Sequence, residues 1–510
     1  MFWFRKTKSQ KQPMWFFILF GGFLCLLFLI FVWINKLKWL SNASVQEQTS
    51  VAQRLARGVD KQIGEFIRDA GKLYQVIQSG GAILDYQTEL DNVFDTLASN
   101  KTIKDHVPEK YAGLYGFGQQ RLPHKDDLLD LLGPDRVRTY LVALMNTSEA
   151  RPNGWFFGSY AIIQLYRGKL VQYKVFDSYY AYYQSTGAKL VLDANYQKVL
   201  GQQSINFISP NVYGFTPQDG GNIKILYEQL FPGQNIDGVI MIKSDLLEFL
   251  IPGLKAKLIE RQFVNASIDL IRWESLPNKK EKYLEDIGGF LEANMSELIN
   301  QIIQNIWYIQ NSQLVQVYLP KSSESFQEFL SKQKLSLVQN LDDIYVWQLN
   351  KSFNKIDKFV NKKFVLQDKN GRIINESNDT TMEMKEKKDE MKNGEVYELY
   401  FFYTLNVPQT YKDQIFSLTE QYDIELTQRE QHILWLSYNR QNQIIVHLPS
   451  WLAFQDLDGE VFCGNDEAKG KEKGKCYKVI EWKHNQIVTF DVLTFGNNVL
   501  RVVRMKVKKV

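Results

Sequence analysis

The chain has 510 residues, and its 61 Lys and Arg nearly balance its 57 Asp and Glu, so charge gives no indication of a nucleic-acid partner. Apolar residues make up 45% of the chain and charged residues 23%, which excludes a disordered chain and a small disulfide scaffold. This length predicts two or three domains with cores of their own, and the 14% aromatic content favours strand-rich cores or sugar-facing surfaces.

The first predicted element is a transmembrane helix over residues 14–34. This segment, "MWFFILFGGFLCLLFLIFVWI", has 21 residues and no charge. About 20 apolar residues at 1.5 Å each span the roughly 30 Å hydrocarbon layer of a bilayer. Trp15 and Trp33 stand where interfacial anchors are expected. The alternative is a buried core helix, but apolar side chains on every face favour the membrane.

The charges beside this segment predict its orientation. Four basic residues precede it, and Lys36 and Lys38 follow in place of a small-residue cleavage site, so we expect an uncleaved signal anchor. The excess of positive charge before the span keeps residues 1–13 in the cytoplasm and exports the rest of the chain. The predicted location is the cytoplasmic membrane, crossed once, with the bulk of the protein outside.

Cys463 and Cys476 flank a glycine- and charge-rich tip, and Cys25 falls inside the predicted span. In an exported chain this pair fits a disulfide that closes the tip, with a contribution to stability of about 3 kcal/mol. A zinc site with His484 as a third ligand is the weaker alternative. The sequence leaves open whether the two cysteines are bonded.

Residues 43–100 are expected to form a helical hairpin. Apolar residues recur at steps of three and four in two stripes that are separated by Gly80 and Gly81. The stripes are Leu55, Val59, Ile63, Phe66, Ala70, Leu73 and Ile77, and then Ile83, Tyr86, Leu90, Val93 and Leu97. The hairpin is either a stalk that binds a partner or, as we prefer, a unit that packs on its own globular domain.

Residues 125–340 are predicted to form an α/β domain, because strand-like runs such as "RTYLVALMN" and "DGVIMI" alternate with helical stretches such as "GGNIKILYEQLF". Gly168 is expected at a hairpin turn between two strands. Residues 341–510 have regularly spaced strands and are predicted to form a β-sandwich, with hairpin turns at Asp368–Arg372 and Asn439–Gln443. The charged segment 375–395 between these turns is expected to be an exposed loop. The predicted fold class is therefore α+β, with one N-terminal membrane helix.

Common catalytic motifs are absent: the chain has no GxSxG, HExxH, P-loop or GxGxxG signature, and its five His are scattered. The best candidate site is the turn that holds Glu149, Arg151 and Asn153. Arg151 precedes a proline and is therefore held in extended backbone, where it can bind a carboxylate or phosphate or pair with Glu149. Asp177 ends a predicted strand, at an edge where open α/β sheets bind ligands.

The segment "RTYLVALMNTSEARPNGWFFGSY", followed by "VQYKVFD", resembles the signature of the bacterial "domain of unknown function 4012" family. That pattern runs LLG, RtYLlllqN, ElRptGGFiGSy, and then a hairpin and Asp. Further on, "NIDGVIMIKSDLLEFLI", "DDIYVWQLNKSFNKIDKFV" and "QIIVHLPSW" resemble later stretches of the family. The resemblance runs from about Leu128 to the C-terminus.

This family is itself similar to the LytR-CpsA-Psr enzymes, which transfer glycopolymers from a lipid pyrophosphate carrier to the cell wall. The resemblance implies an α/β domain of LytR-CpsA-Psr type, Arg151 and Glu149 at a phosphate, and Asp177 at a divalent metal such as Mg²⁺. Further ligand-binding candidates are Asn146, Asn153, Ser159, Tyr179 and Tyr180. The enzymes' Arg-Ser-Asp and Pro-Arg-Asp clusters are replaced here by "RPNGWFFGS" and "KVFDS", which lack one arginine and one aspartate.

Two functions follow from these residues. The first is phosphotransfer from a polyprenyl-linked glycan by a signal-anchored envelope protein. The second is non-catalytic binding of an envelope glycan, or a scaffold role, in which the tyrosines of "DSYYAYYQ" form a stacking surface. Those tyrosines fit a core cluster at a strand edge equally well.

Overall fold

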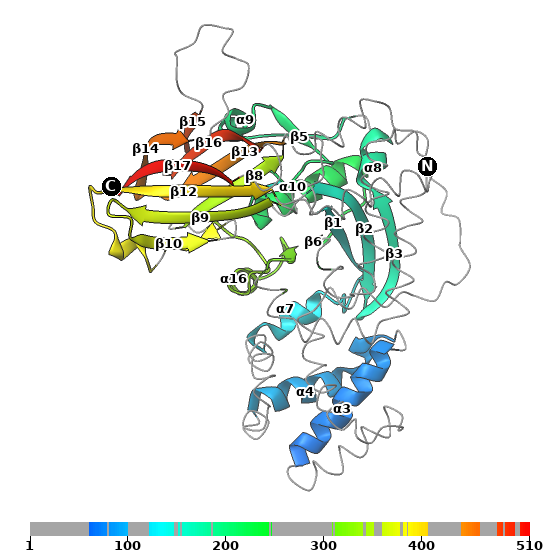
Figure 1. Ribbon diagram of the computed structural model, residues 1–510. Coiled ribbons are helices and arrows are strands. Elements are labelled where there is room, and N and C mark those ends of the chain that lie inside the picture. The colour runs from blue at the N-terminus through cyan, green and yellow to red at the C-terminus, as the bar shows by residue number, and fades with distance from the viewer. Residues whose placement is uncertain are drawn as a thin grey trace, which may run out of the picture.

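The protein is seen in a computed structural model as a mixed α+β chain with several sheets (Figure 1). The structure describes residues 61–78, 81–99, 122–146, 151–152, 156–184, 187–243, 246, 309, 312–339, 343–350, 360–377, 381–384, 386–405, 440–459, 477–482, 485–494 and 500–509. The predicted membrane segment 14–34 and both Cys463 and Cys476 lie outside these residues. No helix within them is both long enough and apolar enough to cross a bilayer.

A five-stranded sheet forms the centre of the first half, in the order β3-β2-β1-β6-β7. Its strands are β1 (Arg138–Asn146), β2 (Phe156–Tyr166), β3 (Lys169–Asp177), β6 (Gly238–Lys243) and β7 (Val315–Tyr318). β1 pairs with β2 antiparallel and with β6 parallel, and β2 pairs with β3 antiparallel. Consecutive residues of β1 and β6 are buried, as expected for central strands with cover on both faces.

Helix α10 (Thr216–Leu230) covers one face of this sheet. Its buried side chains Ile223, Leu226 and Tyr227 share a core with Leu141, Ala143, Met145, Phe157, Tyr160, Val239 and Met241. The approach is close, because a Cβ on Gly220 would lie 2.4 Å from the Cβ of Tyr318 in β7. Glycine at this position therefore permits the helix and strand to touch.

Shorter elements surround this layer. They are η3 (Leu122–His124), α7 (Lys125–Asp130), α8 (Ser178–Gln184), β4 (Lys189–Val191), α9 (Ala194–Leu200), β5 (Ser204–Asn206) and α16 (Glu324–Lys332). The side chains of Asp193 and Ser323 accept hydrogen bonds from the first turns of α9 and α16, so both helices begin at the caps that their sequences provide.

The turn between β2 and β3 confirms the hairpin predicted at Gly168. Arg167 and Gly168 both have positive φ, 53° and 73°, as a type I′ turn requires. Ile83 packs directly on this turn, since a Cβ on Gly168 would lie 2.1 Å from the Ile83 Cγ2. Arg167 also pairs with Asp85 at 2.8 Å, and its carbonyl accepts the Leu84 N–H.

These contacts join the N-terminal helices to the sheet. The helices are α3 (Lys61–Gln78), η2 (Ile83–Tyr86) and α4 (Gln87–Ser99), and they lie at the bottom of Figure 1. Phe66, Leu73, Leu90 and Val93 of the expected stripes are buried, but Tyr86 is 37% exposed. These contacts are consistent with the preferred prediction that the hairpin packs on its own globular domain.

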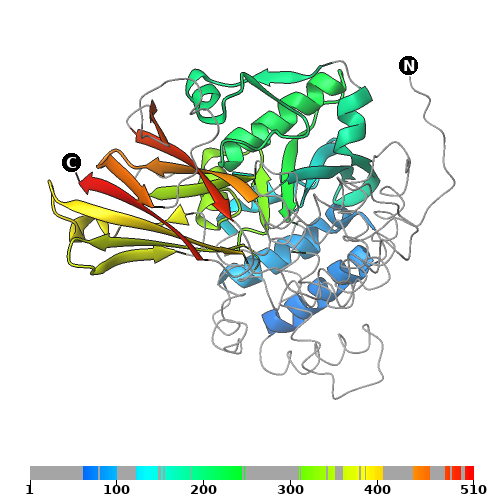
Figure 2. The ribbon, with the colours of Figure 1, turned by 45° about the horizontal axis from the view of Figure 1, so that its top comes forward.

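Two further five-stranded sheets make up the second half and lie against each other (Figures 1 and 2). The first holds, in spatial order, β10 (Ile373–Ser377), β9 (Val360–Asp368), β12 (Val396–Leu405), β17 (Leu500–Lys509) and β14 (Leu452–Gly459). The second holds β11 (Thr381–Met382), β8 (Ile344–Asn350), β13 (Arg440–Leu448), β16 (Asn485–Thr494) and β15 (Tyr477–Trp482). One apolar core, with Phe364, Leu399, Ile444, Val488 and Met505 among its members, lies between them.

Two sequence predictions in this half are wrong. The expected turn at Asn439–Gln443 is not a turn, because residues 440–443 pair in register with β16 at the start of β13. The charged segment 375–395 is not simply an exposed loop, since it holds β11 and η6 (Lys388–Glu390). Met382, Met384 and Met391 are buried in the core between the sheets. The burial of these three side chains attaches the described part of this segment to the core.

An aromatic joint connects the two halves. Tyr196 and Phe215 of the first half pack with Tyr345, Trp347 and His447 of the second, and all five are at most 2% exposed. The Tyr196 hydroxyl donates to the Tyr213 carbonyl at 2.9 Å and lies 3.3 Å from the His447 Nε2. Because the hydroxyl has one proton, this geometry assigns the N–H of neutral His447 to Nε2. Burial lowers the pKa of His447 to about 3, so the ring is uncharged at neutral pH.

Candidate functional site

Three strands of the first sheet end at the same edge. β1 and β6 are parallel, and β3 runs in the same direction because two antiparallel pairings separate it from β1. Asn146, Asp177 and Lys243 are the last residues of these strands. Ligands of open α/β sheets bind at this carboxyl edge, and the sequence prediction for Asn146 and Asp177 is consistent with that rule.

A β-bulge at Gly158 shapes the edge. Leu144 lies opposite Ser159, but Met145 lies opposite Phe157, so Gly158 is an extra residue in β2. Phe157 and Tyr160 are three apart in sequence, yet both enter the core beneath α10. In a regular strand such residues would face opposite sides. The bulge therefore rotates the start of β2 just where the candidate residues gather.

Ser159 and Asp177 lie directly opposite each other on β2 and β3 and are 5% and 6% exposed. Their neighbours Tyr160 and Phe176 form the next opposite pair and stack at 5.1 Å on the α10 side. Because side chains alternate along a strand, Ser159 and Asp177 face away from α10. Two of the predicted residues are therefore brought together at the edge.

Asp177 also begins α8. Its Oδ1 accepts the backbone N–H of Tyr179 at 2.8 Å, and the neighbouring Ser178 hydroxyl donates to the Phe157 carbonyl at 2.7 Å. A carboxylate that accepts an N–H at the start of a helix stabilises that helix end. This capping role accounts for at least one of the two Asp177 oxygens.

Arg151 and three aromatic rings form a row at the same edge, here called the edge row. The Arg151 guanidinium carbon lies 5.4 Å from the centroid of the Phe156 ring, which lies 5.7 Å from the Tyr179 ring. Tyr179 in turn stacks with Tyr183 at 6.3 Å, and Tyr183 is 74% exposed. The tyrosines predicted as a stacking surface or a strand-edge cluster therefore lie on a helix, with Tyr183 open to solvent.

The remaining predicted residues are not placed. Glu149, Asn153 and the side chain of Tyr180 lie outside the described part of the chain, so their predicted roles stay predictions. Within the part that is described, no three His, Cys, Asp or Glu side chains gather closely enough to hold a metal ion. Among the described residues, Arg151 and the buried carboxylate of Asp177 lie at this edge, and the fit to Mg²⁺ rests on Asp177 within that part of the chain.

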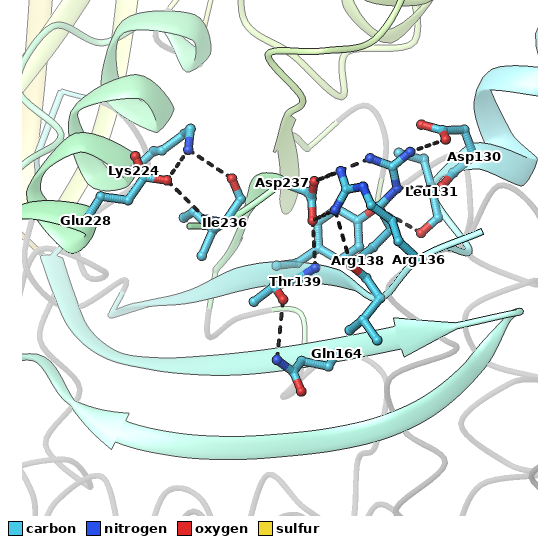
Figure 3. Close-up of polar contacts among 12 residues, drawn as sticks. Asp130, Leu131, Arg136, Arg138, Thr139, Gln164, Lys224, Glu228, Ile236 and Asp237 are labelled. Carbon is cyan, nitrogen blue, oxygen red and sulfur yellow. Dashed lines mark hydrogen bonds and ion pairs between the residues drawn. The ribbon is translucent and has the colours of Figure 1, made fainter. Parts of the chain in front are cut away.

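A second polar cluster, missed by sequence reasoning, lies at the opposite edge (Figure 3). Asp237, just before β6, accepts the Thr139 N–H at 2.9 Å and pairs with both Arg136 and Arg138. Arg138 pairs with Asp130 as well. Burial alone would raise the pKa of Asp237, but hydrogen bonds from Arg136 and Thr139 and both positive charges lower it below its usual value.

This cluster ties the starts of the two parallel strands together. Arg138 and Asp237 belong to "RTYL" and "DGV", two of the stretches on which the resemblance was based. Their residues stand about one hundred positions apart, and only the strand pairing brings them together. A signal for them existed, namely a charge directly before each buried apolar run, but it did not identify the partner.

The segment that contains β1 to β6 matches a known protein family. Residues 135–256 match the family model of DUF4012, a protein of unknown function. The DUF4012 match begins just before β1 and takes in β6, so it includes the edge row, the Ser159–Asp177 pair and most of the Asp237 cluster. The resemblance of residues beyond 256 to this family stays a prediction. No curated protein and no solved structure matches the chain.

Proposed function

We propose that this protein is a signal-anchored envelope protein that binds the phosphate-bearing head of a lipid-linked glycan at the carboxyl edge of its first sheet. The observation that carries the proposal is the edge row, in which the Arg151 guanidinium lies beside a row of three aromatic rings. Arginine recognises phosphate through two parallel N–H donors, and aromatic rings provide flat apolar surface beside a polar group. A sugar phosphate has both features side by side.

The membrane anchor and the lipid-linked ligand are proposed from features outside the edge row. Residues 14–34 would anchor the protein, with the basic residues before them in the cytoplasm. The suspected similarity to LytR-CpsA-Psr enzymes supports a lipid-linked ligand. In this view the N-terminal helices space the α/β domain from the bilayer while they pack against the β2–β3 turn.

Binding is favoured over catalysis by the position of Asp177. A catalytic carboxylate would act on the ligand or on a metal, whereas Asp177 caps α8 through the Tyr179 N–H. The chain also lacks one arginine and one aspartate of the enzymes' clusters. Phosphotransfer is retained as a second proposal because Ser159 and Asp177 lie opposite each other and buried, on the same side of the sheet as Phe156.

The test uses the full chain in detergent micelles and a short-chain polyprenyl pyrophosphate disaccharide as the probe. Arg151→Ala is expected to weaken binding by about tenfold or more, since a charge-assisted bidentate contact is lost. Arg167→Ala is the matched control, because Arg167 lies at the far end of the β2–β3 hairpin and is exposed. Equal affinities for the two variants would contradict the proposed site.

Catalysis is tested separately with Asp177→Asn. This variant keeps an oxygen that can accept the Tyr179 N–H, so α8 is expected to stay capped. If the protein only binds, Asp177→Asn retains the probe as the wild type does. Transfer of the disaccharide phosphate to a hydroxyl of an acceptor glycan, with release of polyprenyl phosphate, by the wild type but not by Asp177→Asn would establish the enzyme instead.

A further inference from the structure

Helix α8 is too short to hold its own position. It has seven residues and follows β3 at the carboxyl edge of the first sheet (Figure 1). Helices shorter than about 12 residues are marginal in water, so tertiary contacts must fix where such a helix lies. Tyr179 and Tyr183 of the edge row stand on α8, whereas Arg151 and Phe156 come from β2 and the segment before it. The edge row therefore stays together only while α8 is held against β2.

One hydrogen bond attaches the start of α8 to β2. The Ser178 hydroxyl donates to the Phe157 carbonyl at 2.7 Å, and Ser178 is fully buried. Each end of this bond adjoins the edge row, since Ser178 precedes Tyr179 and Phe157 follows Phe156. The bond satisfies no N–H of α8, so it is not a helix cap. It joins the backbones that carry the Phe156 and Tyr179 rings, whose centroids lie 5.7 Å apart.

Phe157 is a rigid end for this bond. Its ring is fully buried and meets the Phe207 ring edge-on at 5.0 Å. Phe157 also adjoins the bulge at Gly158, where the strand ladder is locally disrupted, so its carbonyl can accept a bond from outside the sheet. Ala181 of α8 joins the same core as Phe157. A single methyl group packs without a preferred direction, and the Ser178 bond therefore sets how α8 is oriented.

We propose that Ser178 is the positioning residue of the edge row and sets its preference for a phosphate that carries sugar. Arg151 and Phe156 lie on the β2 side of the Ser178 bond, and Tyr179 and Tyr183 lie on the α8 side. A sugar-free pyrophosphate would engage the Arg151 guanidinium alone. A sugar-bearing ligand would engage the guanidinium and the α8 tyrosines together. The inference rests on the proposed function, from which it takes the ligand.

Loss of the Ser178 hydroxyl would lower the fraction of molecules in which the edge row is assembled. A ligand that needs the assembled row then binds with a Kd that is raised by the inverse of that fraction. One buried hydrogen bond changes such an equilibrium by about fivefold. A ligand that needs Arg151 alone does not report this change. Ser178 is fully buried, so it acts through the row and not by contact with the ligand.

The experiment measures the affinity of the full chain in detergent micelles for two probes. One is the short-chain polyprenyl pyrophosphate disaccharide, and the other is the same polyprenyl pyrophosphate without sugar. In Ser178→Ala, affinity is expected to fall about fivefold for the disaccharide probe and less than about twofold for the sugar-free probe. Tyr183→Ala is expected to lose the same preference, because it removes the most exposed ring of the row.

Ser322→Ala is the matched control. The Ser322 hydroxyl also donates to a backbone carbonyl, that of Leu319 at 3.0 Å, but it lies beside α16. This variant is expected to keep both affinities. A loss of stability without a change in the edge row would lower both affinities alike, so the ratio of the two separates positioning from a merely structural role.

Amide hydrogen exchange tests the bond without any ligand. In Ser178→Ala, residues 178–184 are expected to exchange about fivefold faster than in the wild type, while α16 exchanges as before. Unchanged exchange in residues 178–184 would overturn the proposal whatever the probes show.

Equal loss of affinity for both probes in Ser178→Ala, or no loss for either, would also overturn the positioning role. Failure of the proposed function is recognised separately, because it requires that Arg151→Ala bind the disaccharide probe as tightly as the wild type. If Arg151→Ala loses affinity while Ser178→Ala keeps the wild-type preference, the binding site stands and the role of Ser178 falls.

Discussion

Acid should weaken the joint between the two halves through a single residue, His447. Its pKa is about 3 in the folded protein because of burial, against an ordinary value near 6.5 in the unfolded chain. Since the folded value is depressed, the unfolded state binds more protons between these pH values. The stability that neutral His447 contributes is complete above about pH 6.5 and is lost as pH falls toward about 3. Between pH 7 and pH 5 the loss amounts to about 2 kcal/mol.

The perturbation is His447→Phe, which keeps an aromatic ring of similar size beside Trp347 and Phe215. The Tyr196 hydroxyl keeps its bond to the Tyr213 carbonyl in this variant. Urea unfolding at pH 7 and at pH 5, followed by tryptophan fluorescence, gives the pH-dependent loss for each protein. We expect this loss to be smaller by about 2 kcal/mol in His447→Phe than in the wild type. An identical loss in both proteins would refute the assignment of a buried neutral His447.

Three further outcomes are expected. Asp237→Ala should lower the free energy of unfolding by about 2–4 kcal/mol, because it leaves Arg138 and the Thr139 N–H without their buried carboxylate. Asp85→Ala removes an exposed ion pair with Arg167 and should lower the free energy of unfolding by at most about 1 kcal/mol. Urea titrations measure both variants, and equal losses for Asp237→Ala and Asp85→Ala would contradict the greater role of the Asp237 cluster. Gly214→Ala should lower the melting temperature more than Gly233→Ala, since both have a φ of 85° but only the first would place a Cβ 2.4 Å from Trp347. In spheroplasts, protease added from outside should degrade a C-terminal tag on the full chain, and a protected tag would reject the proposed orientation.

The candidate site was partly predictable from local sequence. Asp177 at a strand end and the turn at Gly168 follow from apolar runs and turn residues that any strand–turn–strand segment must have. The runs of β1 and β6 were also recognised as strands, but their parallel pairing was not predicted. What could not be foreseen was the bulge at Gly158, which depends on how β1 and β2 align rather than on glycine alone. The tyrosines were also assigned to a strand edge, whereas the Asp177 and Ser178 hydrogen bonds begin a helix there.

By itself, the sequence indicated the long strands of both halves and helices α3, α4, α10 and α16, because periodicity along the chain reports the face that each element buries. It also determined the uncharged run over residues 14–34. Only the tertiary structure decided that Asp237 meets Arg136 and Arg138, and that His447 closes the joint on Tyr196, 251 residues away. Those pairings depend on sheet order and on packing between the halves. Contacts between distant residues are fixed when many weak interactions are satisfied together, and no local pattern records them.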